Sequence, residues 1–182
     1  MQANQAITRI KIVNAYLKEN QRPLYLMTVG LPGSGKSTFL KTVIDEIGPL
    51  EIASTDDLID READKLGITY SEAFKRINFK TLQKEARQTV EKAVLAKKNI
   101  ANDQTNCGTK SRRTKLETIP SAYYKIALVF DVPDNVLRQR LDKRAEETGK
   151  IIPPYVVSQM AANWNHPTKS EGFDEIIEIS NI

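Results

Sequence analysis

The chain has little cysteine, histidine or tryptophan, with one residue of each among its 182. The single cysteine, Cys107, cannot form an internal disulfide, which argues against a disulfide-stabilised scaffold and favours a reducing cytoplasm. No apolar run approaches membrane-spanning length, and the first ten residues lack the hydrophobic segment of a signal peptide. We therefore expect a cytoplasmic protein with no membrane partner. Trp164 and His166 are expected to serve as a packing residue and a loop residue.

Size and charge fit one soluble domain spanning residues 1–182. The chain is 40% hydrophobic and 27% charged, which is ordinary for a globular protein large enough to bury a core. The formal charge is +4, from 27 Lys and Arg against 23 Asp and Glu. This mild excess is compatible with a nucleic-acid or nucleotide partner but does not establish one.

Apolar periodicity predicts helices that alternate with short strands. Strands are expected over residues 24–29, 50–54, 99–101, 124–130 and 175–179. Helices are expected over residues 4–19, 37–47, 55–65, 71–97, 110–118, 134–148 and 154–164, with residues 1–22 forming a helical extension. This order predicts an α/β fold with a mostly parallel sheet and helices on both faces. Ligands in such folds bind beyond the carboxyl ends of the strands.

The segment Gly30–Thr38 fits the phosphate-binding pattern G-x-x-x-x-G-K-[ST] and lies between a predicted strand and a predicted helix. Its glycines let backbone N–H groups converge on phosphates at a helix N-terminus. We therefore expect ATP and Mg²⁺ as cofactors, with Lys36 on the β- and γ-phosphates and Ser37 on the metal. The alternative is an ordinary glycine-rich turn, which the complete motif and its context disfavour. The predicted nucleotide-binding residues of the loop are Gly33, Ser34, Gly35, Lys36, Ser37 and Thr38.

Polar residues follow two other predicted strands. Asp56 comes just after the strand at 50–54, where a carboxylate can orient an attacking hydroxyl and accept its proton. A role as N-cap of the next helix is an equally good interpretation. Asp103 ends the strand near the loop and can hold magnesium. Thr105 and Asn106 can bind substrate, although a polar turn is the better interpretation of each residue taken singly.

Arginines on two predicted helices complete the set of candidates. Arg140 and Arg144 lie one turn apart on the helix at 134–148, where they can stabilise the transferring phosphoryl group or form a solvated face. Leu141 is expected on the core stripe of that helix. Arg112 and Arg113 belong to a basic cluster after Asn106 that suits a polyanionic acceptor, or one face of a solvated helix.

In these motifs the chain resembles the P-loop polynucleotide 5′-hydroxyl kinases of phages and of animal DNA repair. The resemblance spans roughly residues 24–180 and has five features in order. These are the loop Gly30–Thr38, the segment Ser54–Asp57, the strand end Asp103–Asn106 followed by Arg112–Arg113, the segment Val129–Pro133 before an arginine-bearing helix, and Pro167–Ile176 with its P-T-x-x-E-G-F pattern. The loop is generic, whereas the ordered set is much more specific.

The resemblance implies a P-loop kinase-type fold with an arginine-bearing lid. It implies Mg²⁺- and ATP-dependent transfer of the γ-phosphoryl group to a 5′-hydroxyl of DNA or RNA. Lys36 and Ser37 would serve ATP and metal, Asp56 would be the general base, and Arg140 or Arg144 would contact the β- and γ-phosphates. Thr105, Asn106, Arg112 and Arg113 are the further candidates for binding the substrate. If the protein is phage-encoded, it would act in the host cytoplasm.

The sequence departs from the family at one position. The phage enzyme carries an arginine three residues after the base that binds the acceptor phosphate, and here that position is Ile59. Arg61 is close, but helical geometry points it elsewhere. The chain also lacks the D-x-D-G-T phosphatase signature, so we expect kinase activity without end-trimming phosphatase activity. The alternatives are a small-molecule kinase, acting on a nucleoside, sugar or antibiotic, and a nucleotide-dependent switch without a phosphoacceptor.

Overall fold

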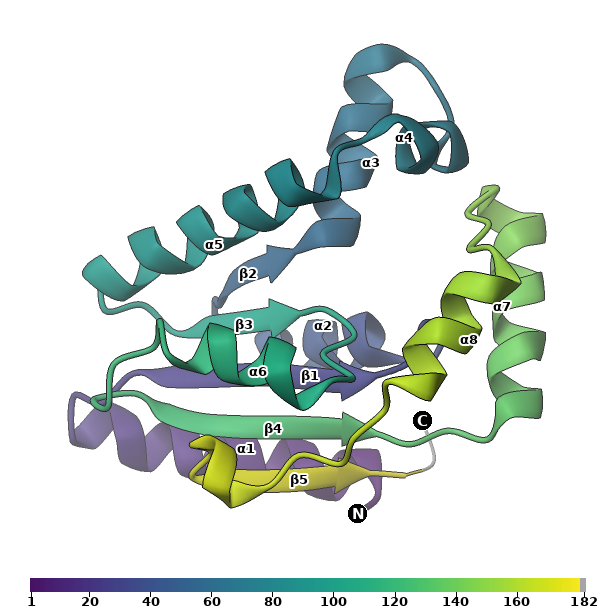
Figure 1. Cartoon of the computed structure of the whole chain (residues 1–182). Coiled ribbons are helices and arrows are strands. Elements are labelled where there is room, and N and C mark those ends of the chain that lie inside the picture. Colours follow the sequence, from purple (N-terminus) through teal and green to yellow (C-terminus); the bar gives the residue numbers. More distant parts are fainter. Residues whose placement is uncertain (181–182) are drawn as a thin grey trace.

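A five-stranded parallel sheet forms the centre of the computed structural model, which describes residues 1–180 (Figure 1). The strand order is β2-β3-β1-β4-β5, and all four neighbouring pairs are parallel. The strands are β1 (Leu24–Gly30), β2 (Glu51–Ser54), β3 (Ile100–Asp103), β4 (Tyr124–Phe130) and β5 (Glu175–Ile179). The predicted α/β class is confirmed, because parallel neighbours require the helical crossovers that the sequence pattern indicated.

Helices cover both faces of the sheet (Figure 1). The helices of the described residues are α1 (Ala3–Glu19), α2 (Lys36–Ile47), α3 (Thr55–Leu66), α4 (Tyr70–Arg76), α5 (Phe79–Leu95), α6 (Thr109–Leu116), α7 (Asp134–Thr148) and α8 (Pro154–Ala162), with a short 3₁₀ turn at Lys169–Glu171. Helices α1 and α2 pack on one face of the sheet, and α5 and α6 pack on the other. No helix in residues 1–180 combines the length and apolar character needed to cross a bilayer.

Alternation along β1 divides the apolar core into two layers. Leu24 and Leu26 pack with the buried faces of α1 and α2. Tyr25 and Met27 point to the opposite face and pack with α5 and α6. A third cluster joins α3, α4 and the start of α5 away from the sheet. Helices α3 and α4 and the start of α5 therefore project beyond the carboxyl ends of the strands (Figure 1).

The single helix predicted over residues 71–97 is wrong. The structure breaks it between α4 and α5, where Ile77 adopts an extended conformation with φ −73° and ψ 140°. The Asn78 side chain accepts a hydrogen bond from Lys80 N at 3.0 Å and caps the new helix. Helix α4 therefore ends here as a separate helix that packs against α3.

Helix α7 differs from its prediction in its packing. Leu137 is buried, but Leu141 and Ala145 are only partly buried. The helix therefore stands away from the sheet, at the side of the molecule that faces α3 and α4 (Figure 1). Arg140 and Arg144 of α7 line the space between this helix and α3.

Candidate functional site

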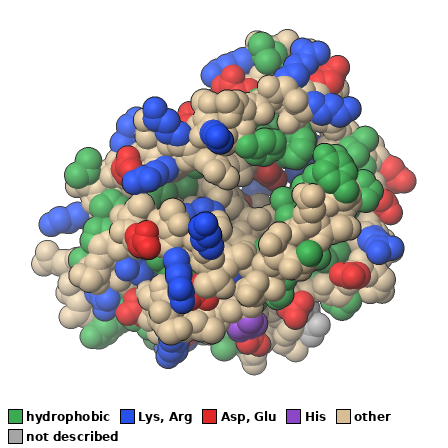
Figure 2. Space-filling model, viewed as in Figure 1, with side chains coloured by type: hydrophobic (Ala, Val, Ile, Leu, Met, Phe, Trp, Pro, Cys, Tyr) green, Lys and Arg blue, Asp and Glu red, His purple; other side chains and the backbone are tan. Residues whose placement is uncertain are grey.

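A large cleft opens at the carboxyl ends of the strands, between α3–α5 on one side and α6, α7 and α8 on the other. Its volume is about 1850 Å³, and Figure 2 shows the surface hollowed at this place. Most of the predicted site residues line it. They are Gly33, Gly35, Lys36, Ser37, Thr38, Asp56, Asp103, Thr105, Asn106, Arg140 and Arg144.

The phosphate-binding loop has the backbone that its glycines predict. Gly33 and Gly35 have φ of +80° and +92°, in the left-handed region that favours glycine. Helix α2 begins at Lys36 directly after this turn, so its N-terminal N–H groups face the cleft. The Lys36 ammonium donates to Leu31 O at 2.8 Å and to Ser34 Oγ at 3.4 Å. Ser34 is fully buried, so its side chain positions Lys36 rather than a ligand.

Lys36 is an almost buried cation beside two carboxylates. Burial lowers the pKa of Lys36, and the charges of Asp103 and Asp56 act against that shift. The ammonium donates to a carbonyl and a hydroxyl and to no carboxylate of the described residues, so an anion entering the loop could accept a charge-assisted hydrogen bond from it. This arrangement suits a phosphate group.

A magnesium ion fits the oxygens at the strand end. The Ser37 hydroxyl donates to Asp103 Oδ2 at 2.6 Å, and Thr28 Oγ1 donates to Asp103 Oδ1 at 3.3 Å. Residues 1–180 contain no cluster of three or more His, Cys, Asp or Glu side chains that could hold a metal alone. Magnesium commonly takes one or two protein oxygens together with water and substrate phosphates. Ser37 and Asp103 are therefore the residues that would hold it.

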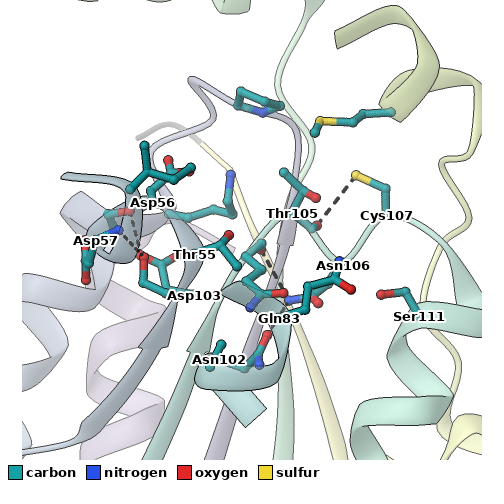
Figure 3. Close-up of a pocket in the computed structure, with 18 of the residues that line it drawn as sticks. Thr55, Asp56, Asp57, Gln83, Asn102, Asp103, Thr105, Asn106, Cys107 and Ser111 are labelled. Carbon is teal, nitrogen blue, oxygen red and sulfur yellow. Dashed lines mark hydrogen bonds between the residues drawn. The ribbon is translucent and has the colours of Figure 1, made fainter. Parts of the chain in front are cut away.

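Asp56 faces the cleft from the first turn of α3 (Figure 3). Its interpretation as the N-cap is wrong, because Ser54 is the cap and its Oγ accepts from Asp57 N at 3.2 Å. The Asp56 side chain is 52% exposed. Its carboxylate accepts a hydrogen bond from Tyr70 Oη at 3.1 Å. The local fold thus leaves this carboxylate available to a second hydroxyl.

Helix α7 connects the two halves of the site. Arg144 Nη2 lies 3.7 Å from Asp56 Oδ2, and Arg140 Nη1 donates to Gly33 O at 3.4 Å. A Cβ atom at Gly33 would lie 3.2 Å from Leu141 Cγ, so the helix packs closely on the loop. The two arginines therefore flank the path from the phosphate loop to Asp56.

Sequence reasoning missed Tyr70 and Lys150. Burial, followed by the charge of Asp56, raises the pKa of Tyr70, so its hydroxyl remains a donor. The Lys150 ammonium lies 4.9 Å from the centre of the Tyr70 ring and forms an ion pair with Asp60. No motif marks these residues, because the fold and not their spacing brings Tyr70 to Asp56 and Lys150 to Tyr70 and Asp60.

The prediction that Arg112 contacts substrate is wrong. Its side chain is fully buried and forms hydrogen bonds with both Glu171 oxygens, at 2.8 and 2.9 Å. It also donates to the carbonyls of Asn106, Cys107 and Asn165 at 2.9–3.0 Å. Arg112 therefore ties the Asp103–Asn106 strand end to the P-T-x-x-E-G-F segment.

The structure also places Arg113 and Asn106, two further residues predicted to bind substrate, in other roles. Arg113 is exposed and lies outside the cleft lining. Asn106 is buried, and its Nδ2 donates to Thr28 O at 2.7 Å and Asn102 Oδ1 at 3.0 Å. Its side chain therefore supports the cleft floor, while the neighbouring Thr105 stays accessible (Figure 3).

Comparison with protein families gives a match to the AAA domain over residues 26–167. The chain belongs to this AAA-domain family. The matched range begins in β1 and includes the phosphate loop, Asp56, Asp103, Arg140 and Arg144. Family membership and the loop geometry together imply nucleotide binding with a metal.

Solved structures of P-loop kinases share the fold. A chain from Chloroflexus aurantiacus, provisionally assigned as a kinase, matches with a TM-score of 0.67 at 15% identity, covering 86% of this chain and 84% of that one. A gluconokinase from Sinorhizobium meliloti matches with a TM-score of 0.55 at 15% identity, covering 88% and 85%. A chain of the Pnkp1/Rnl/Hen1 RNA repair complex is 28% identical, with a TM-score of 0.63, covering 78% of this chain and 44% of that one.

Proposed function

We propose that this AAA-domain protein transfers the γ-phosphoryl group of ATP to the 5′-hydroxyl of a nucleic acid. The observation that carries the proposal is the half-exposed Asp56 carboxylate. It faces the same cleft as the Lys36 loop and lies between Tyr70 Oη and the Arg144 guanidinium. Phosphoryl transfer to an alcohol needs such a carboxylate on the side opposite the leaving group.

Each residue has a defined part in the reaction. The loop N–H groups and Lys36 hold the triphosphate, and Ser37 and Asp103 would hold Mg²⁺, which neutralises charge on the phosphates. The oxygen of the acceptor hydroxyl bonds to the γ-phosphorus while Asp56 accepts the proton of that hydroxyl. The bond between the γ-phosphorus and the β–γ bridging oxygen breaks at the same time. Arg140 and Arg144 stabilise the charge on the transferring group. The products are ADP and a 5′-phosphorylated end.

Two observations support a nucleic acid as acceptor. The 28% identical chain comes from an RNA repair complex, although this chain spans less than half of it. Lysines and arginines also line the cleft beyond Asp56, on α5 and α6. Together with the ordered motifs, these features favour a polyanionic acceptor.

A small-molecule acceptor is the second candidate. Ile59 is 1% exposed and packs in the α3–α5 cluster, so it offers no charge to an acceptor phosphate. Arg61 does not replace it, because its guanidinium forms an ion pair with Glu85 at 2.7 Å. The shared fold of a gluconokinase is compatible with this alternative.

A panel of acceptors tests the proposal. The protein is incubated with γ-labelled ATP, Mg²⁺ and, separately, a 5′-hydroxyl oligonucleotide, a nucleoside or gluconate. We expect label on the oligonucleotide. Label on the small molecules alone would favour the second candidate, and ATP hydrolysis that no alcohol changes would favour a switch without an acceptor.

Asp56→Asn tests the assignment of the base. Loss of a general base typically lowers the rate by about 10²–10⁴-fold, with little change in ATP binding. Asp64→Asn is the matched control, because Asp64 is exposed on the same helix and lies outside the cleft lining. Full activity of Asp56→Asn would remove Asp56 from the mechanism.

A further inference from the structure

The cleft continues beyond Asp56 into a space between α5 and α6, which we call the α5–α6 groove. On α5 it is lined by Lys80, Lys84 and Arg87, whose spacing places them on one helical face. On α6 it is lined by Lys110 and Lys115. The acidic residues of the cleft lie on α3 and at the end of β3, so neither wall of the groove contributes a carboxylate to its lining.

The floor of the groove holds a cation without a counter-charge. Lys115 Nζ donates to Gln104 Oε1 at 2.5 Å and to Asn106 Oδ1, and within residues 1–180 it has no carboxylate in ion-pair distance. Burial lowers the pKa of Lys115 to about 8. A bound anion would compensate the charge of this ammonium.

A second polar group on the floor lacks a protein partner. The Tyr25 hydroxyl is fully buried, lines the same cavity and has no hydrogen-bond partner in the described part of the chain. Buried hydroxyls are normally paired. Tyr25 therefore leaves one unpaired, buried polar atom beside the cavity.

Two exposed aromatic rings line the cleft from opposite walls. Phe79 at the start of α5 is 41% exposed, and Tyr155 at the start of α8 is 65% exposed. Phe79 is held edge-on against Phe74, with ring centroids 5.0 Å apart. Hydrophobic surface borders the hollow on both sides in Figure 2. Exposed rings beside a basic groove are the features that bind single-stranded nucleic acids, through stacked bases and backbone phosphates.

We propose that the α5–α6 groove binds the acceptor as a single strand beyond its 5′-terminal nucleotide. Lys84, Lys110 and Lys115 contact backbone phosphates, while Phe79 and Tyr155 stack on bases. The inference rests on the proposed function and assigns the strand its path. The cavity of about 1850 Å³ exceeds the roughly 300–1,000 Å³ of a small-ligand site, so it has room for several nucleotides beside ATP. Paired bases are stacked within a duplex, so a duplex would not offer them to these rings.

Acceptor length is the first test. Transfer is measured with a nucleoside 3′-monophosphate, with 5′-hydroxyl single strands of increasing length, and with a blunt duplex of the same sequence. We expect KM to fall as the strand lengthens to several nucleotides and to rise for the duplex. A KM that is independent of length, or a duplex that reacts as well as the single strand, would overturn the inference.

Matched charge variants locate the path. Lys84→Gln and Lys110→Gln are compared with Lys92→Gln and Arg113→Gln, which change exposed cations of the same two helices outside the cleft lining. Each groove variant is expected to raise KM for an 8-nucleotide strand by about tenfold and to reduce the salt slope of binding by about one. The control variants should match the unmodified protein. Equal effects in both sets would contradict the assigned path.

Binding separates this inference from the proposed function. Fluorescence anisotropy with a labelled 8-nucleotide strand reports the groove without any chemistry. If no acceptor is phosphorylated but the strand binds and Lys84→Gln and Lys110→Gln weaken it, the proposed function fails and the groove stands. If oligonucleotides are phosphorylated while these variants bind as the controls do, the groove fails and the proposed function stands.

Discussion

Replacing Arg112 should lower the free energy of unfolding of the protein, because the Arg112 guanidinium holds the fold together and does not contact substrate. Arg112 and Glu171 have 0% and 2% exposed side chains and form two hydrogen bonds with each other. In Arg112→Met, the carboxylate and three backbone carbonyls lose their donor. Loss of one partner of a buried ion pair costs about 3–5 kcal/mol. This is a large share of the roughly 5–15 kcal/mol that stabilises a domain.

Urea denaturation followed by circular dichroism measures this cost. With a slope of about 2–3 kcal/mol per molar urea, the midpoint should fall by about 1–2.5 M. Arg113→Met is the control, because Arg113 is exposed on the same helix and should change stability by less than about 0.5 kcal/mol. Equal midpoints for the two variants would refute the structural role of Arg112.

The same pair predicts a dependence on pH. Burial alone would raise the pKa of Glu171, but hydrogen bonds from Arg112 and the Thr168 N–H outweigh it and lower the pKa below its ordinary 4.5. The stabilisation is therefore fully present above pH 4.5 and is lost as the pH falls through the lowered value. The stability difference between Glu171→Gln and the unmodified protein should shrink in acid. A difference that stays constant from pH 7 to 3 would contradict this account.

Three further outcomes follow from the site. Tyr70→Phe removes the hydroxyl that donates to the Asp56 carboxylate and should slow transfer by about 10–100-fold in a steady-state assay, the value of one hydrogen bond to a charged group; an unchanged rate would exclude a role for it. Cys107 is 5% exposed and burial raises its pKa, so iodoacetamide should label it slowly in the native protein and rapidly in urea, as mass spectrometry would report. Oligonucleotide affinity should weaken by about tenfold at most between pH 7 and 9, because Lys115 loses its proton in this range. The Lys115 ammonium faces neutral amides and the Cys107 thiol. Lys115→Gln should abolish this dependence of affinity on pH.

The sheet could be predicted because its signals are local. The apolar runs of β1 and β4 and the strand–helix alternation are written in consecutive residues. The break between α4 and α5 could not, because the apolar stripe continues from Phe74 to Leu82 and neither proline nor glycine marks Ile77–Asn78. There the side chain of Asn78 competes with the helix, and tertiary packing of α4 on α3 decides the outcome.

The candidate site was predictable to the extent that it depends on strand ends. The loop backbone follows from its glycines, and the convergence of Asp56 and Asp103 follows from a parallel sheet. Tyr70 could not be found, since its hydroxyl reaches Asp56 through the turn between α3 and α4. The burial of Arg112 could be predicted, because Arg112 lies four residues before Leu116 and both share the buried face of α6.

The most direct measurement is transfer of label from γ-labelled ATP to a 5′-hydroxyl oligonucleotide by the unmodified protein, Asp56→Asn and Asp64→Asn. We expect labelled strands with the unmodified protein and Asp64→Asn, and a loss of about 10²–10⁴-fold with Asp56→Asn. Unlabelled strands with all three proteins, or equal labelling with all three, would contradict it.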